Sequence, residues 1–236
     1  MTIYDHLLVF TFAVAYPLYG FISYRRFIAN LSEDEVIDRK SMYLQTIVPH
    51  WILFLIAVFA WWWSGRNWSD IGVTISADPI QLWMLMGIVA VIATYLIFIW
   101  RLQTGRSDRQ EWLERMNNVE LVLPRRRDEL SHFYALSITA GVVEEFLWRG
   151  LLIWYLQFAV PLWSAVLISS ILFGLAHAYQ GLKSMPPIVF IGLVFSLIYV
   201  FSGSLLLAVL LHAVFDALQG RLAYEVLAEP EVSPSP

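Results

Sequence analysis

Charged side chains interrupt one stretch of the sequence that is otherwise suited to lipid. Residues 133–143 carry no charge, Glu144, Glu145 and Arg149 follow, and residues 150–160 are again uncharged. A charged side chain at the centre of a membrane helix costs roughly 2.5–3.5 kcal/mol, so such groups face a cavity and pair with one another. Later apolar stretches hold three more ionisable residues, His177, His212 and Asp216.

The spacing of the first group predicts one ion pair and one carboxylate without a partner. Glu145 and Arg149 are four residues apart, and on a helix this spacing allows an ion pair. Glu144 points about 100° away around the same helix, where no residue of opposite sign faces it. A carboxylate held in an apolar cavity is a candidate general base.

The two histidines also have neighbours at helical spacing. His212 and Asp216 are four residues apart, so the acid can orient the imidazole or the two can hold a ligand together. Phe173 lies four residues before His177, which predicts an aromatic ring on the same helical face. The alternative is structural: His212 could make a hydrogen bond between helices, and the charged pair could be a clamp.

Together these residues predict a site that activates water. Glu144 would take a proton from water, and His177 would position or share that water. His212 and Asp216 would stabilise the oxyanion of a tetrahedral intermediate. Six ionisable groups on three apolar segments, with almost no other charge in lipid, disfavour a purely structural explanation.

The composition indicates a membrane protein. Hydrophobic residues make up 59% of the 236 residues and charged residues 14%, against about 45–50% and about 25% in soluble domains. The absence of cysteine excludes disulfides, thiolate metal ligands and thiol nucleophiles. A net charge of −4 gives no support for nucleic-acid binding.

Seven stretches predict transmembrane helices, so we expect an all-α polytopic membrane helical bundle that forms a single domain over 1–236. An eighth helix would require that one boundary is misplaced. No basic segment precedes the first stretch, so we interpret it as a retained anchor and not as a cleaved signal peptide. The stretches are Leu7–Tyr24, Leu44–Trp63, Ile80–Trp100, His132–Leu156, Pro161–Ala178, Pro186–Phe201 and Ser204–Gln219.

Basic residues gather in alternate loops. Of the 15 Lys and Arg residues, all but Arg66 and Arg149 follow the first, third, fifth or seventh stretch. Cytoplasmic loops are enriched in such residues. We therefore expect a multi-pass protein of the cell (inner) membrane, with its N-terminus outside and its C-terminus in the cytoplasm. Segment 108–123 predicts a cytoplasmic amphipathic helix, or else an ordinary connector, and 228–236 a disordered tail.

Three short motifs carry a resemblance to a known family. "EEFLWR" fits the pattern EExxxR, "FGLAH" fits FxxxH, and "HAVFD" fits Hxxx followed by Asn or Asp. In this order, on separate late helices, they resemble the motifs of the CPBP (Abi) family, which groups type II CAAX prenyl endopeptidases with bacteriocin-processing and immunity proteins. The resemblance covers 131–220, the expected catalytic core, whereas 1–130 carries no family signature.

The resemblance implies an intramembrane endopeptidase of the glutamate type. Glu144 would be the base, His177 would help to hold the water, and His212 with Asp216 would form the oxyanion hole. The supporting residues would be Glu145, Arg149 and Phe173.

No cofactor is expected. The alternative is a zinc enzyme with Glu144, His177, His212 and Asp216 as ligands, since three protein ligands plus water make a catalytic zinc site. The absence of an HExxH pair favours the metal-free version.

One position departs from the prenyl endopeptidases, which carry Asn where this chain has Asp216. Asn donates a hydrogen bond, whereas an ionised Asp only accepts. Asp216 must therefore be protonated, or orient His212, or favour a metal.

The expected partners are a membrane-anchored protein or peptide substrate and the bilayer, with no nucleic acid. CAAX proteins, bacteriocin leaders and C-terminal sorting signals are all open as substrates, and we expect the catalytic cavity to open toward the cytoplasm. An ion-coupled transporter is the first competing function, although the motifs are not repeated as in many transporters. A non-catalytic immunity or scaffold protein is the second.

Overall fold

A computed structural model describes residues 1–32, 37–74, 79–103 and 121–228. Over these residues the chain is helical, without strands, which confirms the predicted all-α membrane bundle. The amphipathic helix predicted over 108–123 lies almost entirely outside the described residues. The predicted tail does so as well.

All seven predicted stretches lie in helical rods. Two of these rods contain more than one segment, because a short π-helical segment lies inside each of them. The first rod joins α1 (Ile3–Phe10), the π-helical η1 (Thr11–Ala15) and α2 (Tyr16–Asn30); the second and third are α3 (Arg39–Trp63) and α4 (Pro79–Gln103). The fourth joins α6 (Arg127–Glu145), the π-helical η3 (Phe146–Leu152) and α7 (Ile153–Leu156), and α8 (Leu162–Ala176), α9 (Met185–Ser202) and α10 (Leu205–Leu227) follow. Short 3-10 turns are η2 (Trp68–Ile71), η4 (Ala178–Gln180) and η5 (Leu182–Ser184).

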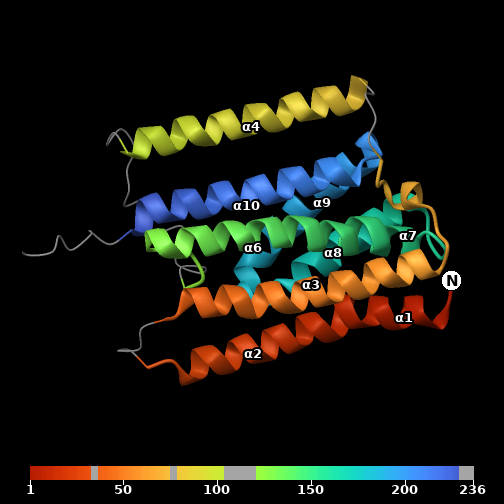
Figure 1. The fold of residues 1–236 in the computed structure, drawn as a ribbon, viewed down its shortest axis with the longest axis horizontal. Coiled ribbons are helices and arrows are strands. Elements are labelled where there is room, and N and C mark those ends of the chain that lie inside the picture. The colour runs from red at the N-terminus through yellow and green to blue at the C-terminus, as the bar shows by residue number, and fades with distance from the viewer. Residues whose placement is uncertain (33–36, 75–78, 104–120, 229–236) are drawn as a thin grey trace, which may run out of the picture.

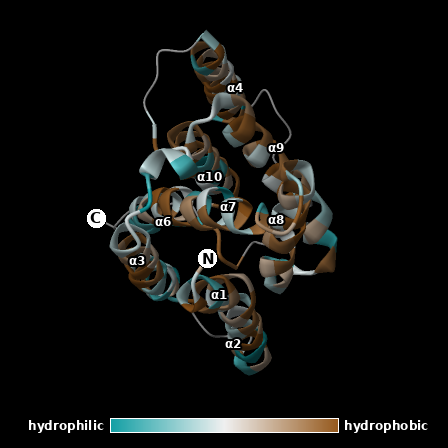
Figure 2. Cartoon of the chain, turned by 90° about the vertical axis from the view of Figure 1, so that its right-hand side faces the viewer, coloured by the Kyte–Doolittle hydropathy of each residue, from teal (hydrophilic) through white to brown (hydrophobic). Residues whose placement is uncertain are grey.

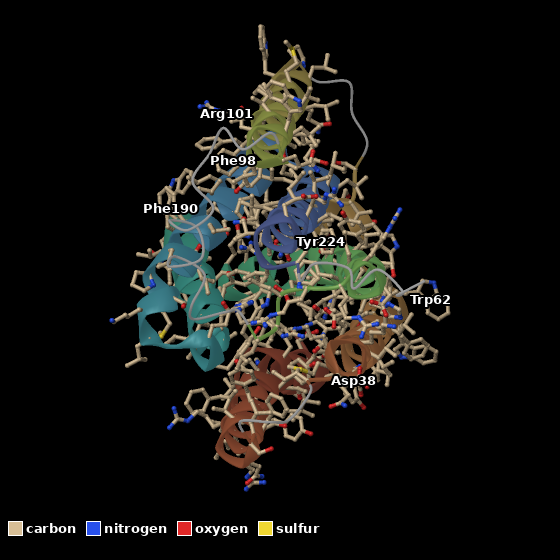
Figure 3. All side chains as sticks on the ribbon, turned by 90° about the vertical axis from the view of Figure 1, so that its left-hand side faces the viewer. Asp38, Trp62, Phe98, Arg101, Phe190 and Tyr224 are labelled. Carbon is tan, nitrogen blue, oxygen red and sulfur yellow. The ribbon has the colours of Figure 1, made fainter. Side chains whose placement is uncertain are left out.

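Successive rods run in opposite directions, so the N-terminus and the end of α10 lie at opposite ends of the bundle (Figure 1). Asp38 and Arg101 mark the end onto which Figure 3 looks. Arg66 lies at the other end, between α3 and η2. The charge asymmetry of the loops is thus an asymmetry between the two ends of the bundle, while the orientation in the membrane stays a prediction.

Within the described part of the chain, five helices are long and apolar enough to cross a membrane, which supports a multi-pass membrane protein. They are Ile3–Asn30, Arg39–Trp63, Pro79–Gln103, Leu182–Ser202 and Leu205–Leu227. The two remaining rods are exceptions for identifiable reasons. The rod formed by α6, η3 and α7 carries several charges, and α8 has only 15 residues. These two rods carry much of the candidate site.

The rod formed by α6, η3 and α7 lies at the centre of the bundle. Seen end-on in Figure 2, it has α3, α8 and α10 around it, whereas α4 lies at the edge. Gly141 allows the close approach of α6 to α10, because a Cβ there would lie 2.7 Å from the Ala213 Cβ. Small residues permit such contacts between membrane helices. The charged motif is therefore placed in the middle of the protein and away from lipid.

At the opposite end from the loop cations, an ion pair fastens the first helix to the bundle. Arg66 donates to both carboxylate oxygens of Asp5, at 2.8 and 2.7 Å. Its guanidinium also lies over the Trp61 and Trp154 rings, at 5.2 and 4.5 Å from their centroids. Arg66, the one loop cation at this end of the bundle among the described residues, is thus neutralised by a bidentate ion pair with Asp5.

Candidate active site

The two adjacent glutamates occur where the central helix changes its winding. α6 ends at Glu145, and the seven residues of η3 continue the rod as a π-helix. Short π-helical segments inside α-helices are frequent at functional sites. Glu145 and Arg149 are completely buried here, while Glu144 points to a different, partly accessible side.

Glu145 is the centre of a buried polar cluster. Arg149 Nη1 donates to Glu145 Oε1 at 2.7 Å, as the spacing predicted. His212 Nδ1 lies 2.6 Å from the same oxygen, a contact that the sequence did not predict. Glu145 Oε2 has no hydrogen-bond partner among the described residues. The supporting pair therefore joins the central rod to α10 and holds one face of the His212 ring.

Arg149 is held from three further directions. Its Nη2 donates to the Gly192 carbonyl at 3.0 Å, and its Nε donates to Ser196 Oγ at 3.4 Å. Its guanidinium lies 4.4 Å from the centroid of the Phe173 ring. A Cβ at Gly192 would lie 3.1 Å from that ring and 3.5 Å from Arg149 Nη2. Glycine is thus suited to this position because the guanidinium and the ring both approach its backbone.

His212 lies between two carboxylates. Its Nδ1 contacts Glu145, and its Nε2 lies 3.4 Å from Asp216 Oδ2. The Phe195 ring packs against the imidazole at a centroid distance of 4.9 Å. An acceptor at each ring nitrogen suits an imidazole that carries hydrogen at both. Of the three readings of Asp216, this arrangement fits the one in which it orients His212.

Glu144 faces two histidines, one near each carboxylate oxygen. His50 Nε2 lies 3.6 Å from Oε1, and His177 Nε2 lies 4.0 Å from Oε2. Both distances exceed those of direct N–H···O hydrogen bonds, which are about 2.7–3.2 Å. A polar separation of this size suits a bridging water. The side chain that the sequence left without a partner is therefore the one with room for a reactant.

His177 lies at the end of its helix and not within it. α8 ends at Ala176, and His177 adopts φ −95° and ψ 10°. Its Nδ1 lies 2.8 Å from the Phe173 carbonyl oxygen, which accepts its hydrogen. The Phe173 ring lies 4.6 Å from the His177 ring and 6.2 Å from the His212 ring. Phe173 therefore packs against both histidines, as the predicted shared face requires for His177.

The sequence interpretation missed His50. It assigned this histidine to the end of a membrane stretch that began at Leu44, where it would need no special explanation. That assignment is wrong, because α3 begins at Arg39 and runs to Trp63, which places His50 well inside the helix. An imidazole next to Pro49 inside a long apolar helix was the available signal.

Accessibility increases from the buried cluster toward one end of the bundle. The side chains of Glu145 and His212 are 0% and 5% exposed, those of Glu144 and His177 are 15% and 20%, and that of Asp216 is 35%. His177 lies at the α8 end that faces the cation-rich loops. This gradient agrees with a cavity that opens toward the predicted cytoplasmic side.

The proposed zinc ligands do not form one cluster. Among the described residues, no three His, Asp or Glu side chains are grouped closely enough to hold a metal ion. Glu144 and His177 face one another, whereas both nitrogens of His212 face other carboxylates. The donor set, as these residues are placed, therefore does not fit a four-ligand zinc centre.

Comparison with known proteins agrees with the motifs. Residues 126–218 match the family model described as "Type II CAAX prenyl endopeptidase Rce1-like". The chain is also 35% identical over 88 residues to the "Uncharacterized 24.3 kDa protein" of Escherichia coli, an alignment that covers 36% of this chain and 41% of that protein. No solved structure matches. The match over 126–218 confirms the resemblance that the three motifs predicted.

Proposed function

Because residues 126–218 match the family model described as "Type II CAAX prenyl endopeptidase Rce1-like", we propose that this protein is an intramembrane endopeptidase of the glutamate type. The observation that carries the proposal is the separation of Glu144 from its neighbour. Glu145 makes structural contacts with Arg149 and His212, whereas Glu144 faces His177 across a gap that suits a water molecule.

The nucleophile is a water between Glu144 and His177. The Nδ1–H of His177 donates to the Phe173 carbonyl, so in the neutral ring Nε2 presents a lone pair that can accept a hydrogen bond from the water. Glu144 removes the other hydrogen as the oxygen attacks the carbonyl carbon of the scissile peptide bond. General-base catalysis of this kind contributes about 10²–10⁴-fold to a rate.

His212 stabilises the oxyanion that this attack creates. The hydrogen on its Nε2, which Asp216 faces in the free protein, donates to the carbonyl oxygen as negative charge develops. Glu145 holds the opposite nitrogen, so the ring does not have to reorient during the reaction. One donor aimed at an oxyanion contributes about 10²–10³-fold.

The intermediate then collapses with the protons in balance. The proton that Glu144 took from water passes to the leaving amine nitrogen, and the bond from carbon to nitrogen breaks. The products are a carboxylic acid on one fragment and an amine on the other, and Glu144 returns to its ionised form. The net reaction consumes one water for each bond cleaved.

A lipid-attached substrate suits the surroundings of the site. An apolar groove of about 480 Å³ lies between α4, α9 and α10, and its lining includes Phe195 and Phe215. Phe195 also packs directly on His212, so one lining residue of the groove contacts the proposed oxyanion donor. CAAX-type proteins, which carry a prenyl chain near the cleaved bond, are the substrate class that this favours over leader peptides.

The test is cleavage of a pool of membrane-anchored reporters by the purified protein in detergent. Wild type and Glu144→Gln are compared, each with and without a strong chelator. The proposal expects cleavage that is lost in the variant and unaffected by the chelator. Loss with the chelator and recovery with zinc would instead assign these residues to a metal. Equal cleavage by the variant and wild type, or none by either, would contradict the proposed enzyme.

A further inference from the structure

A tyrosine and a histidine from the N-terminal part of the chain approach the proposed base. His50 belongs to α3 and Tyr16 begins α2, and both precede the residues that match the family model. Tyr16 OH lies 3.0 Å from His50 Nδ1, and the two rings pack edge to face at a centroid distance of 5.4 Å. The opposite nitrogen of His50 faces Glu144 Oε1 at 3.6 Å.

The Nδ1 side of His50 fixes the orientation of the ring. Besides Tyr16, the carbonyl oxygen of Thr46 lies 2.8 Å from Nδ1. A carbonyl oxygen only accepts hydrogen bonds, so Nδ1 carries the hydrogen. Two polar partners on Nδ1, together with the edge-to-face tyrosine ring, leave Nε2 aimed at the carboxylate. To hold that carboxylate the His50 ring carries hydrogen at Nε2 as well, as an imidazolium with donors on both nitrogens.

His50 and His177 lie on opposite sides of Glu144 and make the same kind of backbone contact. In each, Nδ1 contacts the carbonyl of the residue four positions earlier, at 2.8 Å. In each, Nε2 faces a different carboxylate oxygen. If His177 holds the water at Oε2, then Oε1 is the oxygen through which the carboxylate itself can be held in place.

Two local departures from regular helix bring these residues to the site. The π-helical η1 ends at Ala15, directly before Tyr16, and shifts the register of the first rod at that point. Pro49 lies inside α3, directly before His50, and a proline inside a helix removes one backbone hydrogen bond and bends the helix. Both irregularities adjoin the residues that touch Glu144 or its partner.

We propose that His50, supported by Tyr16, is a positioning residue that holds the Glu144 carboxylate through Oε1, so that Oε2 faces the water on the His177 side. The inference rests on the proposed function, because it assigns His50 a role in the same reaction. It also makes the N-terminal rods part of the active site, although they lie outside the family match. A misplaced catalytic group can cost on the order of 10²-fold in rate.

The test compares His50→Ala, His50→Gln and Tyr16→Phe with a matched control. His6 and Tyr155 form a second histidine–tyrosine pair far from the site, with 2.6 Å between His6 Nδ1 and the Tyr155 hydroxyl and 5.5 Å between the ring centroids. His6→Ala therefore removes a similar contact without touching Glu144. All variants are assayed for kcat and KM on one reporter and for thermal unfolding in detergent.

His50→Ala should lower kcat on the order of 10²-fold with little change in KM. Added imidazole should restore much of that loss, and His50→Gln, which can donate to Oε1, should be less impaired. Tyr16→Phe should lower kcat about fivefold, the factor expected for one hydrogen bond. His6→Ala should retain the wild-type kcat. If His50→Ala is folded and retains the wild-type kcat, or if His6→Ala loses as much, the inference is wrong.

A measurement without substrate separates this inference from the proposed function. The chain has five histidines, so their ring nitrogens can be assigned by single substitutions in ¹⁵N-histidine NMR spectra. Glu144→Gln should shift the His50 and His177 resonances and leave those of His6 in place. An unshifted His50 would refute the contact whether or not the protein cleaves anything. A shifted His50 in a protein without protease activity would keep the contact and reject the protease.

Discussion

Glu144 and Glu145 are adjacent in sequence, yet their carboxylates lie in two different environments. Glu145 is completely buried and holds Arg149 and His212 at 2.7 and 2.6 Å. Glu144 is partly exposed and faces His50 and His177 at 3.6 and 4.0 Å. One glutamate is thus committed to holding the site together, and the other remains available for chemistry.

The buried pair should be important for stability. Arg149→Met leaves Glu145 buried without its cation, and breaking a buried pair in this way costs about 3–5 kcal/mol. The measurement is the thermal midpoint of the purified protein in detergent. Arg221→Met is the control, because Arg221 pairs with Glu225 in the same i,i+4 spacing on a more exposed surface. A partly exposed pair contributes at most about 1 kcal/mol, so equal losses in the two variants would contradict this role of Arg149.

Asp216 offers a test of the oxyanion assignment. Asp216→Asn replaces a carboxylate with a group that can donate a hydrogen bond, and the site should tolerate or benefit from this change. We expect kcat to equal or exceed that of wild type, whereas His212→Ala should lose about 10²–10³-fold. Initial rates on one reporter substrate measure both. A loss in Asp216→Asn as large as that in His212→Ala would show that the carboxylate charge itself is required.

The apolar groove beside His212 can be filled without disturbing the site. Gly87 lines the groove on α4, and a Cβ placed there meets no atom within 4 Å. Gly87→Phe should raise KM for a lipid-attached reporter and leave the cleavage of the same peptide without its lipid unchanged. One lost methylene contact corresponds to about 0.8 kcal/mol, so several would raise KM by tenfold or more.

The control for this experiment is Gly20→Phe, because Gly20 in α2 also has open space around it but does not line the groove. An unchanged KM for the lipid-attached reporter in Gly87→Phe would mean that the groove does not bind the substrate.

The fold and two of the site contacts were predictable because they depend on local sequence. Hydropathy located all seven rods, and i,i+4 spacing predicted the contacts of Glu145 with Arg149 and of His212 with Asp216. The register between distant helices is set by packing, which no local pattern encodes. The contact of His212 with Glu145, 67 residues away, was therefore not predicted.

Errors at helix ends had a specific cause. Hydropathy marks where the apolar residues end, but a helix continues through polar residues such as Arg39 when its first turn is capped, here by Asp38 accepting from the Ser41 amide. The predicted stretch began at Leu44, five residues after the first residue of α3, so His50 was expected near the end of the helix although it lies in the interior. His177 was expected inside a helix over Pro161–Ala178, but the helix stops at Ala176 and His177 follows its end. π-helical segments such as η3 likewise leave no mark in a hydrophobic pattern.

In the proposed reaction Glu144, and not Glu145, removes the proton from water. The most direct test of this role is chemical rescue of alanine variants by a small carboxylate such as formate, measured as cleavage of a membrane-anchored reporter. Glu144→Ala should lose about 10²–10⁴-fold in rate and recover in proportion to the formate concentration. Glu145→Ala, whose defect is structural, should not recover. Rescue of Glu145→Ala, or full activity of Glu144→Ala without formate, would contradict this assignment.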